Sequence, residues 1–222
     1  MPNPPREPIW TRPARGTRGP QPEHSREAIA RCATALADAG GLSAVTMRAV
    51  ADSLGLRAAS LYRYVDSRAE VLDLMADSAL GEFQLPELDE GPWVDQLLAI
   101  AHEQRRVYLR HPWLLEATRS TGSFGPNALR FFDVCLAILT PVEVPTSRKM
   151  EALAMMTGVV TLFAAPPPPE DVDPTRLFAA VVADPESFPH LCRALADPAS
   201  GGQAPEDLFD RTVLALLTGL LS

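Results

Sequence analysis

Residues 46–65 read TMRAVADSLGLRAASLYRYV, two short helical patterns on either side of a single glycine. In the first pattern Val50 and Leu54 are four residues apart, so they face the same side of a helix. Gly55 tolerates the left-handed backbone geometry that ends a helix in a tight turn. The second pattern returns Leu61 to the core side. The stretch therefore predicts a helix-turn-helix.

The second helical pattern leaves a compact and partly basic surface facing outward. Ala58 and Ala59 are small, so this helix can enter the DNA major groove, which is about 12 Å wide. Arg63 can pair with guanine edges or with phosphate, and Tyr62 offers both a hydroxyl and a ring. Arg57 lies at the N-terminal end, where free amides favour phosphate. We therefore expect this helix to read DNA bases.

Residues around the helix pair extend the predicted DNA-binding surface. Thr46 and Arg48 begin the preceding helix, which crosses the DNA backbone in this arrangement, and Arg68 begins the next helix. Residues 1–24 hold seven prolines and four arginines, which predicts a flexible basic arm able to reach the minor groove. The predicted DNA-binding residues are Thr46, Arg48, Arg57, Ala58, Ser60, Tyr62, Arg63, Tyr64 and Arg68, with Arg15 and Arg18 in the arm.

The remainder of the 222-residue chain also reads as helical. Ala and Leu dominate and strand formers are scarce, which predicts an all-α fold. We expect the arm at 1–24, a helix-turn-helix domain at 25–81 whose linker helix begins near 67, and a larger helical domain at 91–222. Individual helices are expected at 25–39, 46–54, 58–64, 67–81, 93–110, 112–118, 127–139, 147–164, 175–183, 187–196 and 205–221.

Charge is distributed unevenly along the chain. Residues 1–85 carry ten basic and ten acidic side chains, whereas residues 86–222 carry ten basic and eighteen acidic ones, which accounts for the whole formal charge of −8. An acidic chain is not a general binder of polyanions, but it can present a local basic face. Residues 45–68 contain four arginines and two acids, so the predicted helix-turn-helix is locally basic.

The cysteines and the apolar stretches exclude several protein classes. Cys32, Cys135 and Cys192 form no C-x-x-C pair, so we expect neither a zinc site nor a disulfide framework, as in a reducing cytosol. The first residues contain prolines and charge where a signal peptide has an apolar core. The longest mostly apolar stretch, 152–165, is too short to span a bilayer. We expect a cytoplasmic protein without a metal or cofactor.

Two predicted helices, 147–164 and 205–221, are apolar on nearly all sides. Helices of this kind are buried on more than one side. The core of a single helical bundle would explain the pattern, and so would packing against a second copy of the chain. We favour the homodimer, because its two-fold symmetry suits a two-fold DNA site.

The run TMRAVADSLGLRAASLYRYVDSRAEVLDLM at 46–75 resembles the DNA-binding domain of TetR/AcrR-type transcriptional repressors. The LY-x-Y at 61–64, followed by an acidic-Ser-Arg helix start, is particularly similar. The chain has Val65 where the family often has Phe and Arg68 where it often has Lys, and neither change alters the packing or the charge. RHPWLLEA at 110–117 and the IW-x-RP of the arm look similar to proteins of the tetracycline-repressor type.

The resemblance implies a homodimer that sets two recognition helices on a near-palindromic operator, about one DNA turn apart. It also implies that helices between roughly 93 and 165 enclose a pocket for a small molecule, apolar or aromatic, that tilts the linker helix and releases the DNA. Core packing or ion pairing would equally explain the candidate pocket residues. These are His102, Arg105, Trp113, Phe124, Asn127, Phe131, Phe132, Cys135, Met155 and Met156.

An enzyme and an interaction module are the alternatives to a ligand-responsive repressor. A Cys135–His102 pair could serve an enzyme, but H-x-x-x-H, G-x-S-x-G and phosphate-loop motifs are absent from the sequence, so we expect no catalysis. A helical interaction module without DNA binding would suit the acidic chain. Under that alternative, the arginines at 48, 57, 63 and 68 would make no contribution to DNA retention.

Overall fold

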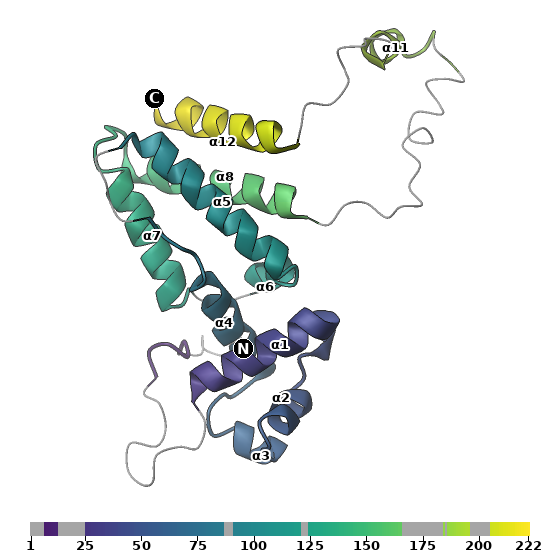
Figure 1. Ribbon diagram of the computed structural model, residues 1–222, viewed down its shortest axis with the longest axis vertical. Helices are drawn as coiled ribbons and strands as arrows, with labels where there is room; N and C mark the ends of the chain where they lie inside the picture. The colour runs from purple at the N-terminus through teal and green to yellow at the C-terminus, as the bar shows by residue number, and fades with distance from the viewer. Residues whose placement is uncertain are drawn as a thin grey trace, which may run out of the picture. The chain divides into compact units, whose positions relative to one another are not determined.

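The computed structural model describes residues 7–12, 25–86, 91–120, 124–165, 184, 186–195 and 205–222, and every regular element in these ranges is a helix (Figure 1). The all-α prediction is confirmed. Two compact units are present, Met1–Ala165 with Val213–Ser222 and Pro166–Thr212. The helices are α1 (Arg26–Ala44), α2 (Met47–Ser53), α3 (Ala58–Leu61), α4 (Arg68–Leu80), α5 (Trp93–Arg110), α6 (Leu114–Ser120), α7 (Pro126–Ile138), α8 (Thr146–Ala164), α11 (Pro189–Leu195) and α12 (Pro205–Leu221).

Most predicted helix boundaries agree with the structure, and two differ for local reasons. α3 ends at Leu61, because the next backbone bonds reach back only three residues, from the Tyr64 N–H to the Leu61 oxygen at 2.9 Å. The break expected at 39–41 is present, because the backbone of Gly40 and Gly41 is not helical and Gly41 has a φ of 69°, but a further helical stretch carries α1 on to Ala44. The helix expected at 175–183 lies outside the described residues.

The first three helices and α4 form the N-terminal part of the first unit. α1 packs along α4 and against α2, and α2 packs against α3. Burying an Ile, Leu or Met side chain contributes roughly 1.5–3 kcal/mol, so this small core stabilises the arrangement strongly. Its side chains without exposed surface are Ile29, Ala33, Val50, Ala51, Leu61, Val71 and Met75.

α4 also connects this core to the helices that follow it. It packs against α6 and α7, while α5 packs against α7 and α8 (Figure 1). The domain boundary expected between 81 and 91 therefore lies inside one compact unit. The second core consists of buried side chains from α5, α6, α8 and α12, namely Leu97, Ile100, Leu114, Leu153, Met156 and Leu217.

Residues 7–12 differ from the extended arm that the sequence predicts. Ile9 is only 1% exposed, and the Arg26 guanidinium donates a hydrogen bond to the Ile9 carbonyl oxygen at 2.9 Å. Arg12 forms ion pairs with two carboxylates at the start of α4. This segment is therefore docked on the helices, whereas Arg15 and Arg18 lie outside the described residues.

None of the described helices has the length and hydropathy that a bilayer crossing requires. Cys32, Cys135 and Cys192 all lie in the described residues, and they form no disulfide. Cys135 has no exposed surface, and its burial raises the pKa of the thiol to about 12.

Candidate nucleic-acid interface

The turn between α2 and α3 has a backbone geometry that requires glycine. Gly55 has a φ of 68°, and its N–H donates to the Asp52 oxygen at 3.1 Å. The Leu56 N–H donates to the Ala51 oxygen at 2.8 Å. These two bonds form a Schellman motif, in which a left-handed residue closes the helix. The predicted glycine turn is confirmed.

The start of α2 is fixed by a side-chain cap and by an arginine from α4. Thr46 Oγ1 accepts a hydrogen bond from the Ala49 N–H at 3.1 Å, as predicted for a helix cap. Arg68 donates from Nε to the Val45 oxygen and from Nη2 to the Leu42 oxygen, both at 2.6 Å. Arg68 thus stabilises the connection between α1 and α2, and its predicted phosphate contact stays a prediction.

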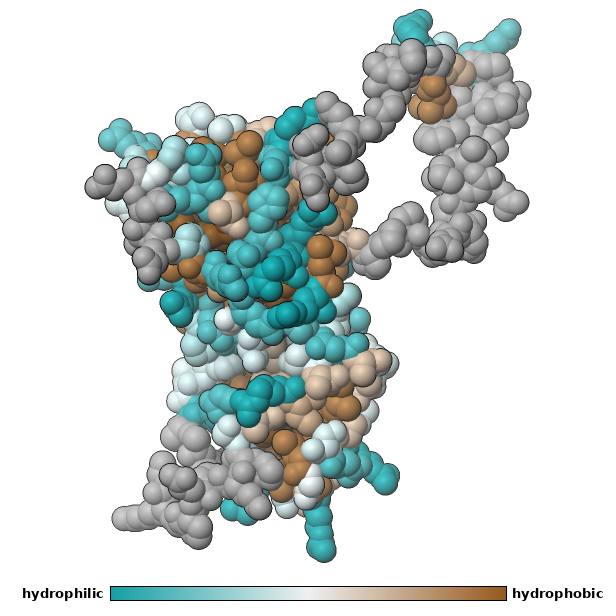
Figure 2. Space-filling model, viewed as in Figure 1, coloured by the Kyte–Doolittle hydropathy of each residue, from teal (hydrophilic) through white to brown (hydrophobic). Residues whose placement is uncertain are grey.

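The outward side of α2 and α3 carries most of the residues predicted to bind DNA. Arg48 has a side chain 88% exposed and pairs only loosely with Asp52, at 3.7 Å. Tyr62 is 48% exposed. In Figure 2 polar side chains project from the end of the molecule that carries these helices. Arg57, Ala58, Ala59 and Arg63 are exposed, and Ser60 and Tyr64 are half-buried.

This surface has the properties that DNA binding requires. Its guanidinium groups can neutralise phosphates, and each neutralised phosphate steepens the salt dependence of binding by about 0.9 log units per log unit of salt. The exposed alanines leave room for base edges, and Tyr62 and Arg63, which follow them in the sequence, are exposed as well. Among the exposed side chains of residues 46–63, Asp52 is the single acid. The surface therefore suits duplex DNA.

The residues predicted to bind a small molecule do not share one environment. His102 is exposed and Arg105 half-buried on α5. On α8, Met156 is buried whereas Met155 is 50% exposed, so the two methionines face different surroundings. Cys135 is fully buried on α7.

Aromatic side chains form a row along α7. Phe131 contacts Phe83 edge to face, with ring centroids 5.6 Å apart, and Phe132 at 5.4 Å. Phe132 in turn contacts Phe124 at 5.3 Å. Phe83 was missed by the sequence analysis, because it follows α4 and precedes the region in which the pocket was expected. Three of the predicted pocket residues are therefore brought together, with Phe83 as a fourth member.

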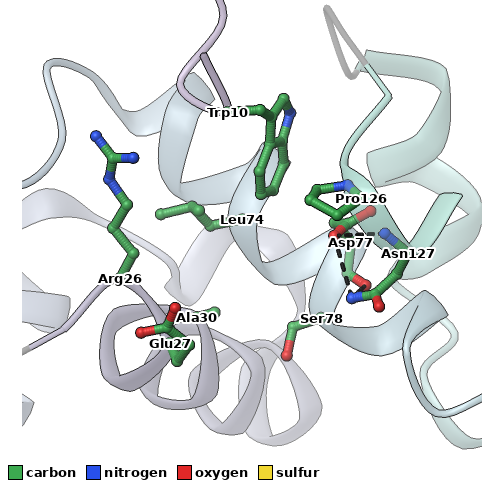
Figure 3. A pocket seen from close by; sticks show the side chains of 9 residues that line it. All are labelled: Trp10, Arg26, Glu27, Ala30, Leu74, Asp77, Ser78, Pro126 and Asn127. Carbon is green, nitrogen blue, oxygen red and sulfur yellow. Dashed lines mark hydrogen bonds between the residues drawn. The ribbon is translucent and has the colours of Figure 1, made fainter. Parts of the chain in front are cut away.

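Asn127 is held by a carboxylate that the sequence did not single out (Figure 3). Asp77 of α4 is 6% exposed and accepts hydrogen bonds from the Asn127 N–H at 3.2 Å, the Asn127 Nδ2 at 3.1 Å and the Ala128 N–H at 3.0 Å. Gly125 and Pro126 begin α7 without a side-chain cap of their own. Asp77 thus caps α7 from another helix, and Asn127 helps to join the two.

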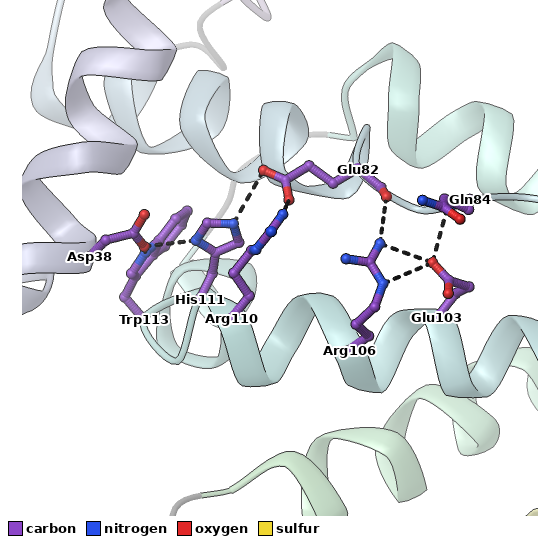
Figure 4. Close-up of polar contacts among 8 residues, drawn as sticks. All are labelled: Asp38, Glu82, Gln84, Glu103, Arg106, Arg110, His111 and Trp113. Carbon is purple, nitrogen blue, oxygen red and sulfur yellow. Dashed lines mark hydrogen bonds and ion pairs between the residues drawn. The ribbon is translucent and has the colours of Figure 1, made fainter.

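Trp113 belongs to a polar network that links α1 to the end of α5 (Figure 4). Its Nε1 donates to Asp38 Oδ1 at 2.6 Å. His111, 4% exposed, lies with Nδ1 at 2.7 Å from the same oxygen and Nε2 at 3.2 Å from Glu82 Oε1. Arg110 pairs with the other Glu82 oxygen at 2.9 Å. Trp113 therefore has a structural partner that the sequence did not indicate.

Gln104 is a buried polar residue that the sequence analysis also missed. It is 2% exposed, and its Nε2 donates to Thr157 Oγ1 of α8 at 3.3 Å. Its Oε1 is buried and has no hydrogen-bond partner among the described residues. A buried acceptor left unpaired costs about 1–3 kcal/mol, so this oxygen can gain from a hydrogen-bond donor between α5 and α8.

Two family comparisons cover most of the chain. Residues 29–75 match the family described as bacterial regulatory proteins, tetR family. Residues 85–222 match the family described as tetracyclin repressor-like, C-terminal domain. Both families consist of regulatory proteins, in agreement with the expectation that the chain is not an enzyme.

The chain is similar to two curated transcriptional regulators. The HTH-type transcriptional repressor DrrR1 of Streptomyces coeruleorubidus is 36% identical over 153 residues, 68% of this chain and 57% of that protein. An HTH-type transcriptional regulator of Saccharopolyspora erythraea is 38% identical over 132 residues, 59% of this chain and 55% of the relative. The chain thus matches little more than half the length of these curated relatives.

Solved structures show the same architecture. The Streptomyces coelicolor TetR family protein ActR in complex with (S)-DNPA has a TM-score of 0.75 and 25% identity, covering 90% of this chain and 98% of that chain. ActR in complex with actinorhodin has a TM-score of 0.71 and 27% identity, covering 90% and 96%.

Proposed function

Because the chain belongs to the tetR family of bacterial regulatory proteins, it is a helix-turn-helix transcriptional regulator, and we propose that it acts as a dimeric repressor which a small molecule releases from its operator. The observation that carries the proposal is the exposed face of α2 and α3. There Arg48, Arg57 and Arg63 are exposed, and so are Ala58 and Ala59, which are small enough for the major groove. The protein would act in the cytoplasm, where the operator is.

The exposed side chains divide into two roles. Ser60, Tyr62 and Arg63 follow the alanines in the sequence and would select bases, whereas Arg48 and Arg57 lie at helix starts and would hold phosphates. Arg15 and Arg18 of the arm would follow the minor groove. Base contacts give sequence preference, and phosphate contacts give affinity that is independent of sequence.

Selection of DNA from a random pool by the purified protein tests this proposal. We expect a near-palindrome with half-sites about one DNA turn apart. Arg63→Ala should relax the preference at one position of each half-site, and Arg48→Gln should weaken all sequences alike and reduce the salt slope by about 0.9. If no sequence is enriched while the variants stay folded, the interaction module without DNA binding is correct.

We propose dimerisation through α8, where large apolar side chains face solvent. Met155 is 50% and Leu162 is 72% exposed, and nothing lies within 4 Å of a Cβ built on Gly158 between them. Leu162→Glu should convert a dimer into a monomer in sedimentation experiments, whereas Leu129→Glu on α7, at a side chain 56% exposed, should leave the dimer intact. Equal behaviour of the two variants would contradict this interface.

We propose that the effector is an aromatic small molecule with a hydrogen-bond donor. The row of phenylalanines beginning at Phe131 offers ring faces, and Gln104 Oε1 offers a buried acceptor. A solved relative binds actinorhodin, so actinorhodin is a suitable probe. We expect it to displace the selected DNA, and Gln104→Leu to weaken its binding about tenfold by removing the acceptor. If Gln104→Leu leaves that affinity unchanged, Gln104 is not the anchor, and if actinorhodin does not displace the DNA, it is not an effector.

A further inference from the structure

The segment from Pro8 to Arg12 is held on the helices by specific contacts. The Thr11 N–H donates to the Pro8 oxygen at 3.1 Å and closes a turn, and Ile9 within that turn is 1% exposed. Arg26 of α1 donates to the Ile9 oxygen at 2.9 Å and to the Arg12 oxygen at 3.0 Å. The backbone of this segment is therefore bound at Ile9 and at Arg12, and the buried Ile9 side chain is its apolar anchor.

Arg12 at the end of the segment joins two carboxylates at the start of α4. Its Nη2 lies 2.5 Å from Glu70 Oε1, and its Nη1 pairs with Asp66. Only 19% of the Arg12 side chain is exposed. Hydrogen bonding to Glu70, followed by the charges of both acids, raises the pKa of the guanidinium. Arg12 thus stays charged, and its two Nη atoms lie against the carboxylates of Asp66 and Glu70, whereas its Nε is buried without a hydrogen-bond partner among the described residues.

The Glu70 carboxylate and the Ser67 hydroxyl fix the segment that follows the recognition helix α3. Glu70 Oε2 accepts a hydrogen bond from the Asp66 N–H at 2.8 Å, and Ser67 Oγ accepts one from the Glu70 N–H at 3.3 Å. Val65, just before them, is 1% exposed. A movement at the start of α4 is therefore transmitted through this short connection to the exposed residues of α3.

Trp10 of the same segment reaches the opposite end of α4. It lines a cavity of about 200 Å³ together with Leu74 and Asp77 of α4 and with Pro126 and Asn127 of α7. Figure 3 shows the indole with Leu74 on one side and Pro126 on the other. The segment thus touches both the start of α4 and its junction with α7.

We propose that residues 8–12 are a clamp that sets the position of α4 and of the recognition helix α3, with Arg12 as a positioning residue and not a DNA contact. This extends the proposed DNA binding, since it assigns a different role to one end of the basic arm. The alternative is that Arg12 leaves its carboxylates and binds a phosphate or the minor groove. The two alternatives differ in what an apolar change at Ile9 should do.

Three variants of the full chain separate the alternatives. Arg12→Gln removes the ion pairs, Ile9→Ser removes the apolar anchor and leaves Arg12 in place, and Arg48→Gln is the matched control at an exposed arginine. Amide hydrogen exchange of residues 65–70 is measured without DNA. Affinity for the DNA selected from the random pool is measured over a range of salt concentrations.

A clamp predicts faster exchange at 65–70 in both Arg12→Gln and Ile9→Ser, but not in Arg48→Gln. It predicts that both clamp variants bind DNA about tenfold more weakly with an unchanged salt slope, whereas Arg48→Gln lowers the slope by about 0.9. The proposal is overturned if exchange at 65–70 is unchanged, or if Arg12→Gln lowers the slope while Ile9→Ser binds normally. Because exchange is measured without DNA, it decides the clamp even if the chain binds none.

Discussion

Replacing Asp77 by Ala removes the cap that α4 provides for α7, and we expect a decrease in the free energy of unfolding of about 3 kcal/mol. Asp77 is 6% exposed and accepts three hydrogen bonds, from the backbone N–H groups of Asn127 and Ala128 and from Asn127 Nδ2. Loss of a helix cap costs about 0.5–2 kcal/mol, and a buried donor left unpaired costs about 1–3 kcal/mol. The two costs add, but water can partly solvate the freed helix end, so we expect a total of about 3 kcal/mol.

Urea unfolding followed by far-ultraviolet circular dichroism measures this change at fixed protein concentration, with the slope m showing that the transition is comparable between variants. Asn127→Ala is the matched control. It removes only the side-chain amide and leaves the two backbone bonds to Asp77, so we expect a cost of about 1 kcal/mol. The cap, not the amide, then carries most of the stability of this junction.

A substitution at Gly125 tests the contact between Asp77 and the start of α7. A Cβ on Gly125 would lie 2.3 Å from Asp77 Cγ, a distance that forces the carboxylate away. Gly125→Ala should therefore be strongly destabilising alone and much less so beside Asp77→Ala, a departure from additivity expected only for residues in contact. If Asp77→Ala falls within about 1 kcal/mol of the unchanged protein, or if Gly125→Ala costs the same in both backgrounds, Asp77 does not cap α7.

Three other measurements test the fold and its ionisable groups. Alkylation of the native protein followed by mass spectrometry should modify the half-buried Cys32 and spare the fully buried Cys135, whose pKa is raised to about 12; labelling of Cys135 in the folded state would contradict its burial. Hydrogen bonding to Arg106 lowers the pKa of Glu103 below the ordinary 4.5. The ionised Glu103 therefore stabilises the folded protein above pH 4.5, and this stabilisation is lost as the pH falls through the lowered pKa. Because Glu103→Gln lacks this ionisable group, its free energy of unfolding in urea should change less between pH 7 and pH 3.5 than that of the unchanged protein. Gly55→Ala should lower the free energy of unfolding by about 1–2 kcal/mol, because φ is 68° there; an unchanged unfolding midpoint would show that the turn does not need glycine.

Local signals explain which parts of this fold the sequence could predict. Thr46 and Ser67 cap their helices with their own side chains, and Gly55 closes α2 within two residues. Each of these features is complete within a few residues, so its pattern is visible in the sequence. The helix pair and its exposed arginines followed from the same short stretch.

The missed features all join residues far apart in the chain. Asp77 caps a helix that begins near residue 126, and Arg12 pairs with carboxylates at the start of α4. No spacing rule connects such pairs, because the tertiary fold brings them together. The arm was predicted as flexible from its prolines and arginines, yet the buried Ile9, the hydrogen bonds from Arg26 and the ion pairs of Arg12 dock part of it. Composition describes an average over the segment and does not report a single buried anchor.

The energies of these contacts indicate where a ligand signal must act on α4. A ligand that moves a regulator from almost wholly DNA-competent to almost wholly incompetent must prefer the second state by about 5.5 kcal/mol. An exposed ion pair such as that between Arg110 and Glu82, with side chains 62% and 35% exposed, contributes at most about 1 kcal/mol. The buried cap of Asp77 on α7 is worth several times more and joins α4 directly to the helix that carries the phenylalanine row. A change of position between α4 and α7 at this cap is therefore a larger energetic step than the loss of any single surface pair.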